Sequence, residues 1–255
     1  MKLSSIILVK NEENNIKRCL ESQIGIIDEI IVLLDSESSD NSENIIRSFP
    51  GVKCETVVWQ GYAKTKSSGL NFVTNDWVFW IDADETLTEE LKKEILKFKE
   101  SVPEHPAYMV PRKAFFLGKW IRHSGWYPGY VTRLFDKTRV KFNENEVHEG
   151  LDVNGETGKL KHPLNHYTDP SIEHYYFKFN KYTSLAAKEI NGKNKQTGVF
   201  AAFIRAVSVF IKMYILKLGF LDGSHGFTLA VFSSNYVFTK YCKVWEKSLP
   251  KGDLK

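Results

Sequence analysis

The first hundred residues alternate between short apolar runs and segments with helical spacing, and this alternation most constrains the fold. The apolar runs, rich in Ile, Val and Leu, are residues 4–9, 28–35, 52–59 and 76–82. Segments of helical spacing follow them at residues 11–22, 38–49, 63–74 and 88–101. Alternation at this spacing predicts an α/β fold with a mostly parallel sheet flanked by helices. Such sheets bind ligands at the carboxyl ends of their strands.

Two of the expected helices carry start signals. The segment at 38–49 has Ser38 or Asp40 as a candidate cap and acidic residues in its first turn. Thr88 caps the strongly patterned helix expected at 88–101.

The amino-acid composition of the chain changes after Pro103 and again at Ser171. Residues 105–170 are rich in aromatic residues, Gly and His, and predict an α+β extension that closes over the strand ends. Residues 1–170 hold 22 basic and 26 acidic residues, whereas residues 171–255 hold 13 and 5. We therefore expect a catalytic domain over 1–170 and a helical, basic extension over 171–255.

Cysteine usage and hydropathy limit the possible classes of protein. Cys19, Cys54 and Cys242 are widely separated, odd in number and without a CxxC pair. This indicates a reducing compartment and argues against a disulfide scaffold or a zinc site. The N-terminal apolar stretch is short for a signal peptide, and no segment reaches about 18 uncharged apolar residues, so a clean transmembrane span is not expected.

Acidic residues end two of the predicted strands. Asp35 closes the second, and Asp82 with Asp84 closes the fourth, where the run WVFWI leads directly into DADE. Carboxylates so close together repel unless positive charge lies between them. They could share a Mg²⁺ or Mn²⁺ ion whose shell a diphosphate completes. The alternative is that Asp82 and Asp84 only cap the following helix.

Several ordered motifs make the chain recognisable. SIILVKNEENNIKRCLES, DEIIVLLDSESSDNS, WQGYAKTKSSGL and DWVFWIDADETLTEEL resemble, in this order, the family 2 glycosyltransferases with the GT-A (Rossmann-like) fold. Within them the chain is most similar to the bacterial lipopolysaccharide core β-1,4-glucosyltransferase group. GWYPGYVTRLF, VHEG and NHYTD match further stretches of that group. The resemblance covers nearly the whole chain.

The resemblance implies roles in binding a UDP-sugar donor. Asp35 would accept a hydrogen bond from the base, and Lys10, Asn11 and Glu12 would line the nucleoside pocket. Lys66 stands where the family often has Arg, near base or phosphate. It keeps the charge but lacks the bidentate guanidinium.

The resemblance also implies the metal ligands and the base. Asp82 would lie near ribose and metal, and Asp84 would ligate the metal directly. An inverting enzyme needs a base on the face opposite the diphosphate, and Glu149 is the candidate. Glu144 and Glu146 are rivals. Glu149 could instead be a surface carboxylate, or could pair with an arginine, Arg133 or Arg139.

Histidines and aromatic residues near these motifs have two interpretations each. His148 and His166 could supply a third metal ligand or contact the acceptor, or could be structural. Trp126 and Tyr127 could stack on a sugar ring or pack in the core.

Residues 199–216 and 227–247 are broadly apolar with a basic edge. Arg205, Ser208 and Lys212 form a narrow polar stripe on the first of them. Such helices fit the surface of an anionic membrane, or alternatively pack on each other and on the catalytic domain. We hypothesise peripheral attachment to the inner face of the cytoplasmic membrane. Nucleic acid is not an expected partner, since no recognised motif is present.

The sequence thus predicts an inverting, metal-dependent hexosyltransferase with a glycan or glycolipid acceptor, glucose being the sugar that the resemblance suggests. A catalytically inactive sugar-nucleotide-binding module is an alternative. A phosphatase of the haloacid-dehalogenase type also fits VFWIDADETL. That chemistry needs further acids after a later strand, and the sequence has no such pair.

Overall fold

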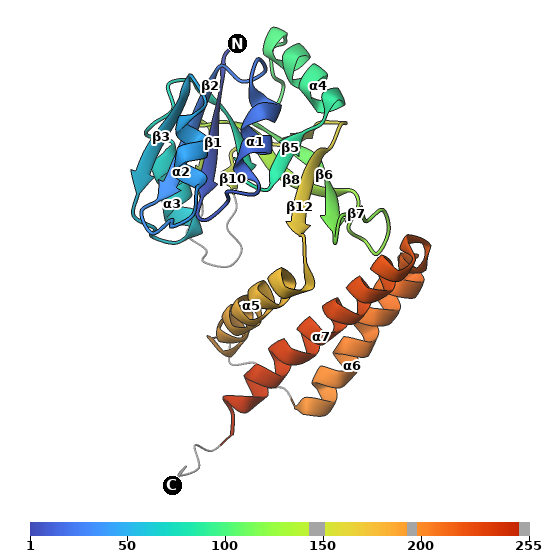
Figure 1. The fold of residues 1–255 in the computed structure, drawn as a ribbon. Coiled ribbons are helices and arrows are strands. Elements are labelled where there is room, and N and C mark those ends of the chain that lie inside the picture. The colour runs from blue at the N-terminus through green and yellow to red at the C-terminus, as the bar shows by residue number, and fades with distance from the viewer. Residues whose placement is uncertain (143–150, 193–197, 250–255) are drawn as a thin grey trace. The chain divides into compact units, whose positions relative to one another are not determined.

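The computed structural model describes residues 1–142, 151–192 and 198–249. The chain divides into two compact units. The first comprises residues 1–113 and 129–166, and the second comprises residues 114–128 and 167–255 (Figure 1).

Four parallel strands form one half of the sheet in the first unit. They are β1 (Leu3–Val9), β2 (Glu29–Asp35), β3 (Val52–Val57) and β4 (Trp77–Asp82), in the order β3-β2-β1-β4. β1 lies between β2 and β4, as expected for strands joined by crossover helices. The four strands predicted from the apolar runs are therefore confirmed.

The other half of the sheet is largely antiparallel, so the sheet is mixed. Its strands are β5 (Glu85–Leu87), β6 (Ala107–Phe116), β8 (Gly129–Asp136), β11 (Thr157–Lys159) and β12 (Leu164–Asp169). β7 (Lys119–Trp120) pairs with the last residues of β6, which belong with it to the second unit. β8 pairs antiparallel with β4 and with β6, and β12 pairs antiparallel with β5. β9 (Val140–Phe142) and β10 (Leu151–Val153) form a separate two-stranded sheet. No helix separates the described strands β6 to β12, and short connections favour antiparallel neighbours.

The helices of the first unit are α1 (Ile16–Gln23), α2 (Ser42–Arg47), α3 (Tyr62–Gly69) and α4 (Glu89–Glu100). Thr88 caps α4 as predicted, because its hydroxyl accepts a hydrogen bond from the Leu91 amide at 3.2 Å. The first two helices begin later than their sequence patterns suggest. Residues 11–15 and 36–41 instead form loops that bond to each other, and Asp40 accepts from the amides of Glu13 and Ser42.

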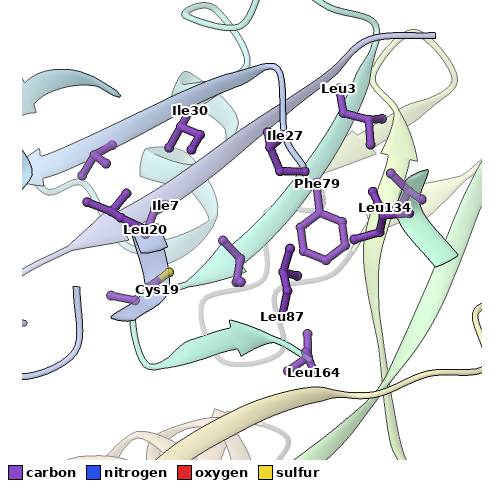
Figure 2. Packing of buried hydrophobic residues seen from close by; sticks show 14 of the residues in the cluster. Leu3, Ile7, Cys19, Leu20, Ile27, Ile30, Phe79, Leu87, Leu134 and Leu164 are labelled. Carbon is purple, nitrogen blue, oxygen red and sulfur yellow. The ribbon is translucent and has the colours of Figure 1, made fainter. Parts of the chain in front are cut away.

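Both faces of the three parallel strands β1, β2 and β4 are buried. In β1, Leu3, Ile7 and Val9 belong to the core on one face and Ile6 to the core on the other. Figure 2 shows the first of these cores, in which Phe79 lies between Ile27, Leu87 and Leu134. Burial on both faces explains why the strands read as continuous apolar runs instead of alternating ones.

The second unit is mainly helical. It contains α5 (Ile172–Gly192), α6 (Val199–Phe210), the π-helix η1 (Ile211–Leu216), the short 3₁₀ helix η2 (Gly219–Asp222) and α7 (Ser224–Glu246). α7 packs against both α5 and α6. Phe116, Ile121 and Leu229 form a small buried core there, with Tyr175 and Phe232 against it.

Residues 199–216 are the described segment that is long and apolar enough to cross a membrane. The segment has a mean hydropathy of 2.0 over 18 residues, and 11% of it is buried. It also contains Arg205 and Lys212, so it is not an uncharged run.

A carboxylate on β2 couples the stability of this sheet to pH. Glu29 accepts hydrogen bonds from Ser4 Oγ at 2.6 Å, Lys53 Nζ at 2.8 Å and the Thr74 amide at 2.8 Å. Burial alone would raise the pKa of Glu29, but these partners lower it to about 2. The stabilisation is therefore present above about pH 4.5, the ordinary Glu value, and disappears as the pH falls toward 2.

We predict that Glu29→Gln lowers the free energy of unfolding at neutral pH by about 1–2 kcal/mol. The gap between variant and wild type should close as the pH falls from about 4.5 toward 2. Urea unfolding followed by circular dichroism at several pH values measures this. Exposed Glu100→Gln is the control, and a gap that is independent of pH would contradict the ion-pair explanation.

Candidate functional site

The carboxyl ends of β1, β2 and β4 meet at one edge of the sheet. Leu8 of β1 lies in register with Leu33 of β2 and with Asp82 of β4. Lys10 and Asp35 follow within two residues of these positions. Parallel pairing thus brings together three residues that the sequence predicts for the site.

Asp35 and Lys10 form an ion pair at this edge. The Lys10 Nζ lies 2.8 Å from Asp35 Oδ2 and 2.6 Å from Glu37 Oε2. Burial would raise the pKa of Asp35, but the bond from Lys10 and a 2.9 Å bond from the Glu37 amide lower it. Asp35 is therefore ionised and oriented while its side chain is only 1% exposed.

The loop after β1 is bound to the loop after β2. Asn11, at a φ of +55°, donates its amide to Ser38 Oγ at 3.0 Å and accepts from the Ser39 amide at 2.8 Å. The Glu12 amide donates to Ser42 Oγ at 2.8 Å. Lys10, Asn11 and Glu12 are thus fixed next to Asp35, as a preformed pocket requires.

Helix α3 brings Lys66 to the end of β4. Its Nζ lies 4.1 Å from the centre of the Trp80 ring and 3.8 Å from Asp82 Oδ1. The Trp80 indole donates to the same Asp82 oxygen at 3.3 Å. Lys66 is 8% exposed, so its charge is held close to the first aspartate of DADE.

Arg133 on β8 supplies positive charge between two of the acids. One nitrogen of its guanidinium donates both to Asp82 Oδ2 and to Glu85 Oε1, the latter at 2.6 Å. The second oxygen of Glu85 accepts the Asp82 amide at 3.1 Å. Arg133 and Lys66 outweigh partial burial and hold the pKa of Asp82 well below its ordinary value. Complete burial raises the pKa of Glu85 despite Arg133.

Asp84 faces a histidine from another strand. His166 on β12 lies in register with Glu85 on β5, and its Nε2 is 3.4 Å from Asp84 Oδ2. Burial would lower the pKa of His166, but Asp84 raises it. Arg112 on β6 is close enough to be influenced by these carboxylates, although burial is the main cause of its lowered pKa.

Arg133 and Arg112 were not among the predicted site residues. Arg133 lies in the motif GWYPGYVTRLF, which carried the resemblance, but its pairing with Asp82 and Glu85 depends on the antiparallel contact of β8 with β4. The sequence explanation had expected a bound metal diphosphate to balance these acids. In the structure, Arg133 already balances Asp82 and Glu85.

The remaining predicted residues divide into two groups. His148, Glu149, Glu144 and Glu146 lie outside the described residues. Trp126 and Tyr127 belong to the second unit, where they contact Phe116 and Trp120 edge-on at 6.3 and 5.4 Å between ring centres. These contacts favour the packing interpretation for both rings.

The donor chemistry for a metal fits Asp84 best. Its carboxylate is 18% exposed, and carboxylate oxygens are the ligands that Mg²⁺ and Mn²⁺ prefer. One oxygen of Asp82 is already bound to Arg133. Within residues 1–142, 151–192 and 198–249, no group of three or more His, Cys, Asp or Glu residues is placed to hold a metal.

Comparison with known proteins decides the family. The sequence profile of Glycosyl transferase family 2 matches residues 4–158, which include the site residues described above except His166. The chain belongs to this family. Its membership and the sheet of the first unit confirm the predicted GT-A fold class, and they leave no support for the phosphatase interpretation.

This family 2 glycosyltransferase is similar over nearly its whole length to curated bacterial proteins. An uncharacterized glycosyltransferase of Rickettsia prowazekii is 30% identical, over 99% of this chain and 90% of that protein. The lipopolysaccharide core biosynthesis glycosyltransferase LpsC of Rhizobium meliloti is 25% identical, over 98% and 94%. Among solved structures, S. aureus TarS 1–349 in complex with UDP-GlcNAc aligns with a TM-score of 0.48 at 15% identity, covering 97% of this chain and 91% of that one.

We predict that Arg133→Met destabilises the protein by about 3–5 kcal/mol, because it leaves the fully buried Glu85 without a cation and removes one of the two cations beside Asp82. Adding Glu85→Gln should recover part of this loss, since it removes one of the two acids. Urea unfolding of the single and double variants measures both effects. Arg139→Met, at an exposed position three residues beyond β8, is the matched control. Equal stability of Arg133→Met and the control would contradict the bridging role.

Proposed function

We propose that the protein is an inverting, metal-dependent glycosyltransferase that moves a hexose, glucose, from a UDP-sugar to a lipopolysaccharide or lipooligosaccharide core or another lipid-linked glycan. One observation carries the proposal. The adjacent strand ends of a family 2 chain present an ionised Asp35, a buried Lys66 and the Asp82–Asp84 pair at one edge of the sheet.

The nucleoside would bind at the ends of β1 and β2. Asp35 is ionised and held by Lys10, so it is an acceptor for a uracil N–H, which would reach its buried carboxylate when the Lys10 side chain moves. Lys10, Asn11 and Glu12 would line the same pocket, since their loop is bonded to the loop that follows Asp35. A pocket fixed before the donor arrives loses less conformational entropy on binding.

The diphosphate would lie beside the end of β4. Lys66 provides a buried positive charge there, and Arg112 provides a second from β6. Because Arg133 is already occupied by Asp82 and Glu85, we assign it to positioning and leave the diphosphate to the other two cations.

A Mg²⁺ or Mn²⁺ ion would be held by Asp84 together with Asp82 and His148. Bound there, the ion would neutralise charge on the departing UDP. The chain itself gives Asp82 and Asp84 different partners and therefore different roles. Arg133 fixes Asp82, whereas the described partner of Asp84 is His166.

Glu149 would act as the base. It would take the proton of the acceptor hydroxyl as the oxygen attacks the anomeric carbon opposite the diphosphate, which inverts the configuration. Glu144 and Glu146 remain the rival bases.

The acceptor and the location are proposed from the chain's relatives and its second unit. LpsC is named for lipopolysaccharide core biosynthesis, and the motifs resemble the core glucosyltransferase group. A lipid-linked acceptor suits an enzyme bound peripherally to the inner face of the cytoplasmic membrane. The basic, helical second unit provides the means, with 13 basic and 5 acidic residues over 171–255.

The first test is a donor screen by thermal shift with UDP-sugars and GDP-sugars, each with and without Mn²⁺. We expect UDP-sugars to raise the melting temperature, with a larger rise when Mn²⁺ is present. Asp84→Asn should remove the metal-dependent part, because it removes the accessible carboxylate. Asp152→Asn, an exposed aspartate on β10, is the control. Stabilisation by UDP without turnover of any UDP-sugar would favour an inactive binding module.

The second test concerns the base. Glu149→Gln should lower the rate of transfer by about 10²–10⁴-fold while the Kd for the donor stays unchanged. Glu144→Gln and Glu146→Gln, made in parallel, identify which carboxylate acts. Near-normal turnover of Glu149→Gln with loss in either companion would move the assignment to that residue.

A further inference from the structure

Helix α6 and η1 expose a continuous row of large apolar side chains. We call it the apolar stripe, and its members recur every three or four residues: Phe200, Phe203, Ile204, Val207, Ile211 and Ile215. Phe200 is 76% exposed and Phe203 is 53% exposed. A stripe of this regularity on a helix normally faces a partner.

The opposite side of the same helix is already packed. Ala202 is fully buried and Ala206 is 5% exposed, and Ser234 of α7 donates to the carbonyl of Ala206 at 2.8 Å. Arg205 lies over the ring of Tyr241, also on α7, at 4.6 Å. The apolar stripe is therefore not the face that joins the helices of this unit.

The turn between the two helices continues the exposed apolar surface. We call residues 216–223 the tip, and its exposed members are Leu216, Leu218, Phe220 and Leu221. Leu216 is 70% exposed and Leu221 is 56% exposed. Four large apolar side chains on one turn are unusual for a surface in contact with water only.

Basic side chains surround the tip. Lys217 lies within the tip. Asp222, also in the tip, binds residues 119–123, which carry further basic side chains. The Asp222 carboxylate, in a residue only 3% exposed, accepts from the His123 amide at 2.9 Å, and the Lys119 Nζ donates to its carbonyl at 2.8 Å. Lys119, Arg122 and Lys217 are all exposed, and we call them the basic cluster.

The tip is built as a tight structure. A Cβ on Gly219 would lie 2.6 Å from Ser124 Oγ, and one on Gly226 would lie 1.9 Å from the Gly219 carbonyl oxygen. The Ser124 amide also donates to the Lys217 carbonyl at 2.9 Å. These close approaches hold the apolar residues and the basic cluster in a fixed arrangement.

We propose that the tip inserts into the headgroup region of an anionic bilayer, with the apolar stripe lying along the interface and the basic cluster binding lipid phosphates. Exposed apolar residues next to cations are the pattern that binds such surfaces. Residues 199–249 carry six basic residues against two acidic ones, and one of the acids is the buried Asp222. Little negative charge is therefore left to oppose an anionic surface.

Insertion along the interface fits the charges better than a span does. A span of 199–216 would carry Arg205 and Lys212 through the hydrocarbon region. α7 packs along α6 and would bring Asn235 and Lys240 with it. A second copy of the chain is also a poorer occupant, because a symmetric dimer through the tip would bring two basic clusters together.

The inference deepens the membrane part of the proposed function and rests on it, but its test needs neither donor nor acceptor. Wild-type protein is sedimented with vesicles of phosphatidylcholine, with and without phosphatidylglycerol, at low and high salt. We expect binding to the anionic vesicles that weakens at high salt. Failure of wild type to bind them at low salt would overturn the proposal, whereas loss of transfer on a soluble acceptor would instead concern the proposed reaction.

Two double variants separate the apolar and the ionic contributions. Leu216→Gln with Leu221→Gln, which leaves the charge unchanged, should lower the partition coefficient on anionic vesicles by about tenfold or more. Arg122→Glu with Lys217→Glu should lower it and also remove its salt dependence. Val102→Glu, at a position 90% exposed in the first unit, is the control and should bind as wild type does. Circular dichroism and the thermal unfolding midpoint confirm that each variant folds.

Insertion itself is read from fluorescence. Vesicles with bromine-labelled lipids should quench the added tryptophan of Leu216→Trp and leave that of Val102→Trp unaffected. Equal quenching of the two, or unchanged vesicle binding by the apolar variant, would overturn insertion at the tip. Light scattering tests the other occupant. If the wild type is a dimer that does not bind vesicles, and the variant with Leu216 and Leu221 both replaced is a monomer, the surface binds a second copy of the chain.

Discussion

The contact of Arg133 with Asp82 and Glu85 is the interaction on which the site depends. Strand β4 runs from a buried core directly into three acids, and two of them pack around one guanidinium from β8. A buried carboxylate without a partner would cost several kcal/mol, or would take up a proton. The same contact joins the parallel half of the sheet to the antiparallel half, because β4 belongs to the first and β8 to the second. The charge balance of the site therefore depends on the topology of the sheet.

This pairing gives the acids of DADE different properties. Asp82 is held ionised by Arg133 and Lys66, and Glu85 is wholly buried and accepts the amide of Asp82. Asp84 has neither constraint and faces His166. The three carboxylates therefore differ in role. Asp82 is fixed by Arg133, Glu85 holds the backbone of Asp82, and Asp84 is left as the proposed metal ligand. The sequence interpretation, in which Asp82 and Asp84 shared a metal, did not include Arg133.

The difference between what could and could not be predicted follows from the range of the interactions. Strands β1 to β4 and the Thr88 cap depend on neighbouring residues, so the apolar runs and the cap pattern were sufficient. The late start of α1 was missed because residues 11–15 bond to the loop after β2, which helical spacing does not show. Arg133 was missed for the same reason at longer range. It lies 51 residues from Asp82, and only the antiparallel pairing of β8 with β4 brings them together.

The two units differ in which groups occupy an unfavourable environment: charged groups are buried in the first, and apolar groups are exposed in the second. In the first, charged groups that cannot reach water find partners inside the protein, as Glu85 and Asp35 do. In the second, apolar groups that lack a partner inside the protein are held in contact with solvent by a rigid turn, although exposing them costs free energy. The buried Asp222 contributes to this rigidity, since its bonds fix the turn on which Leu216 and Leu221 are exposed. Insertion into a bilayer, as we propose for the tip, would remove these residues from water.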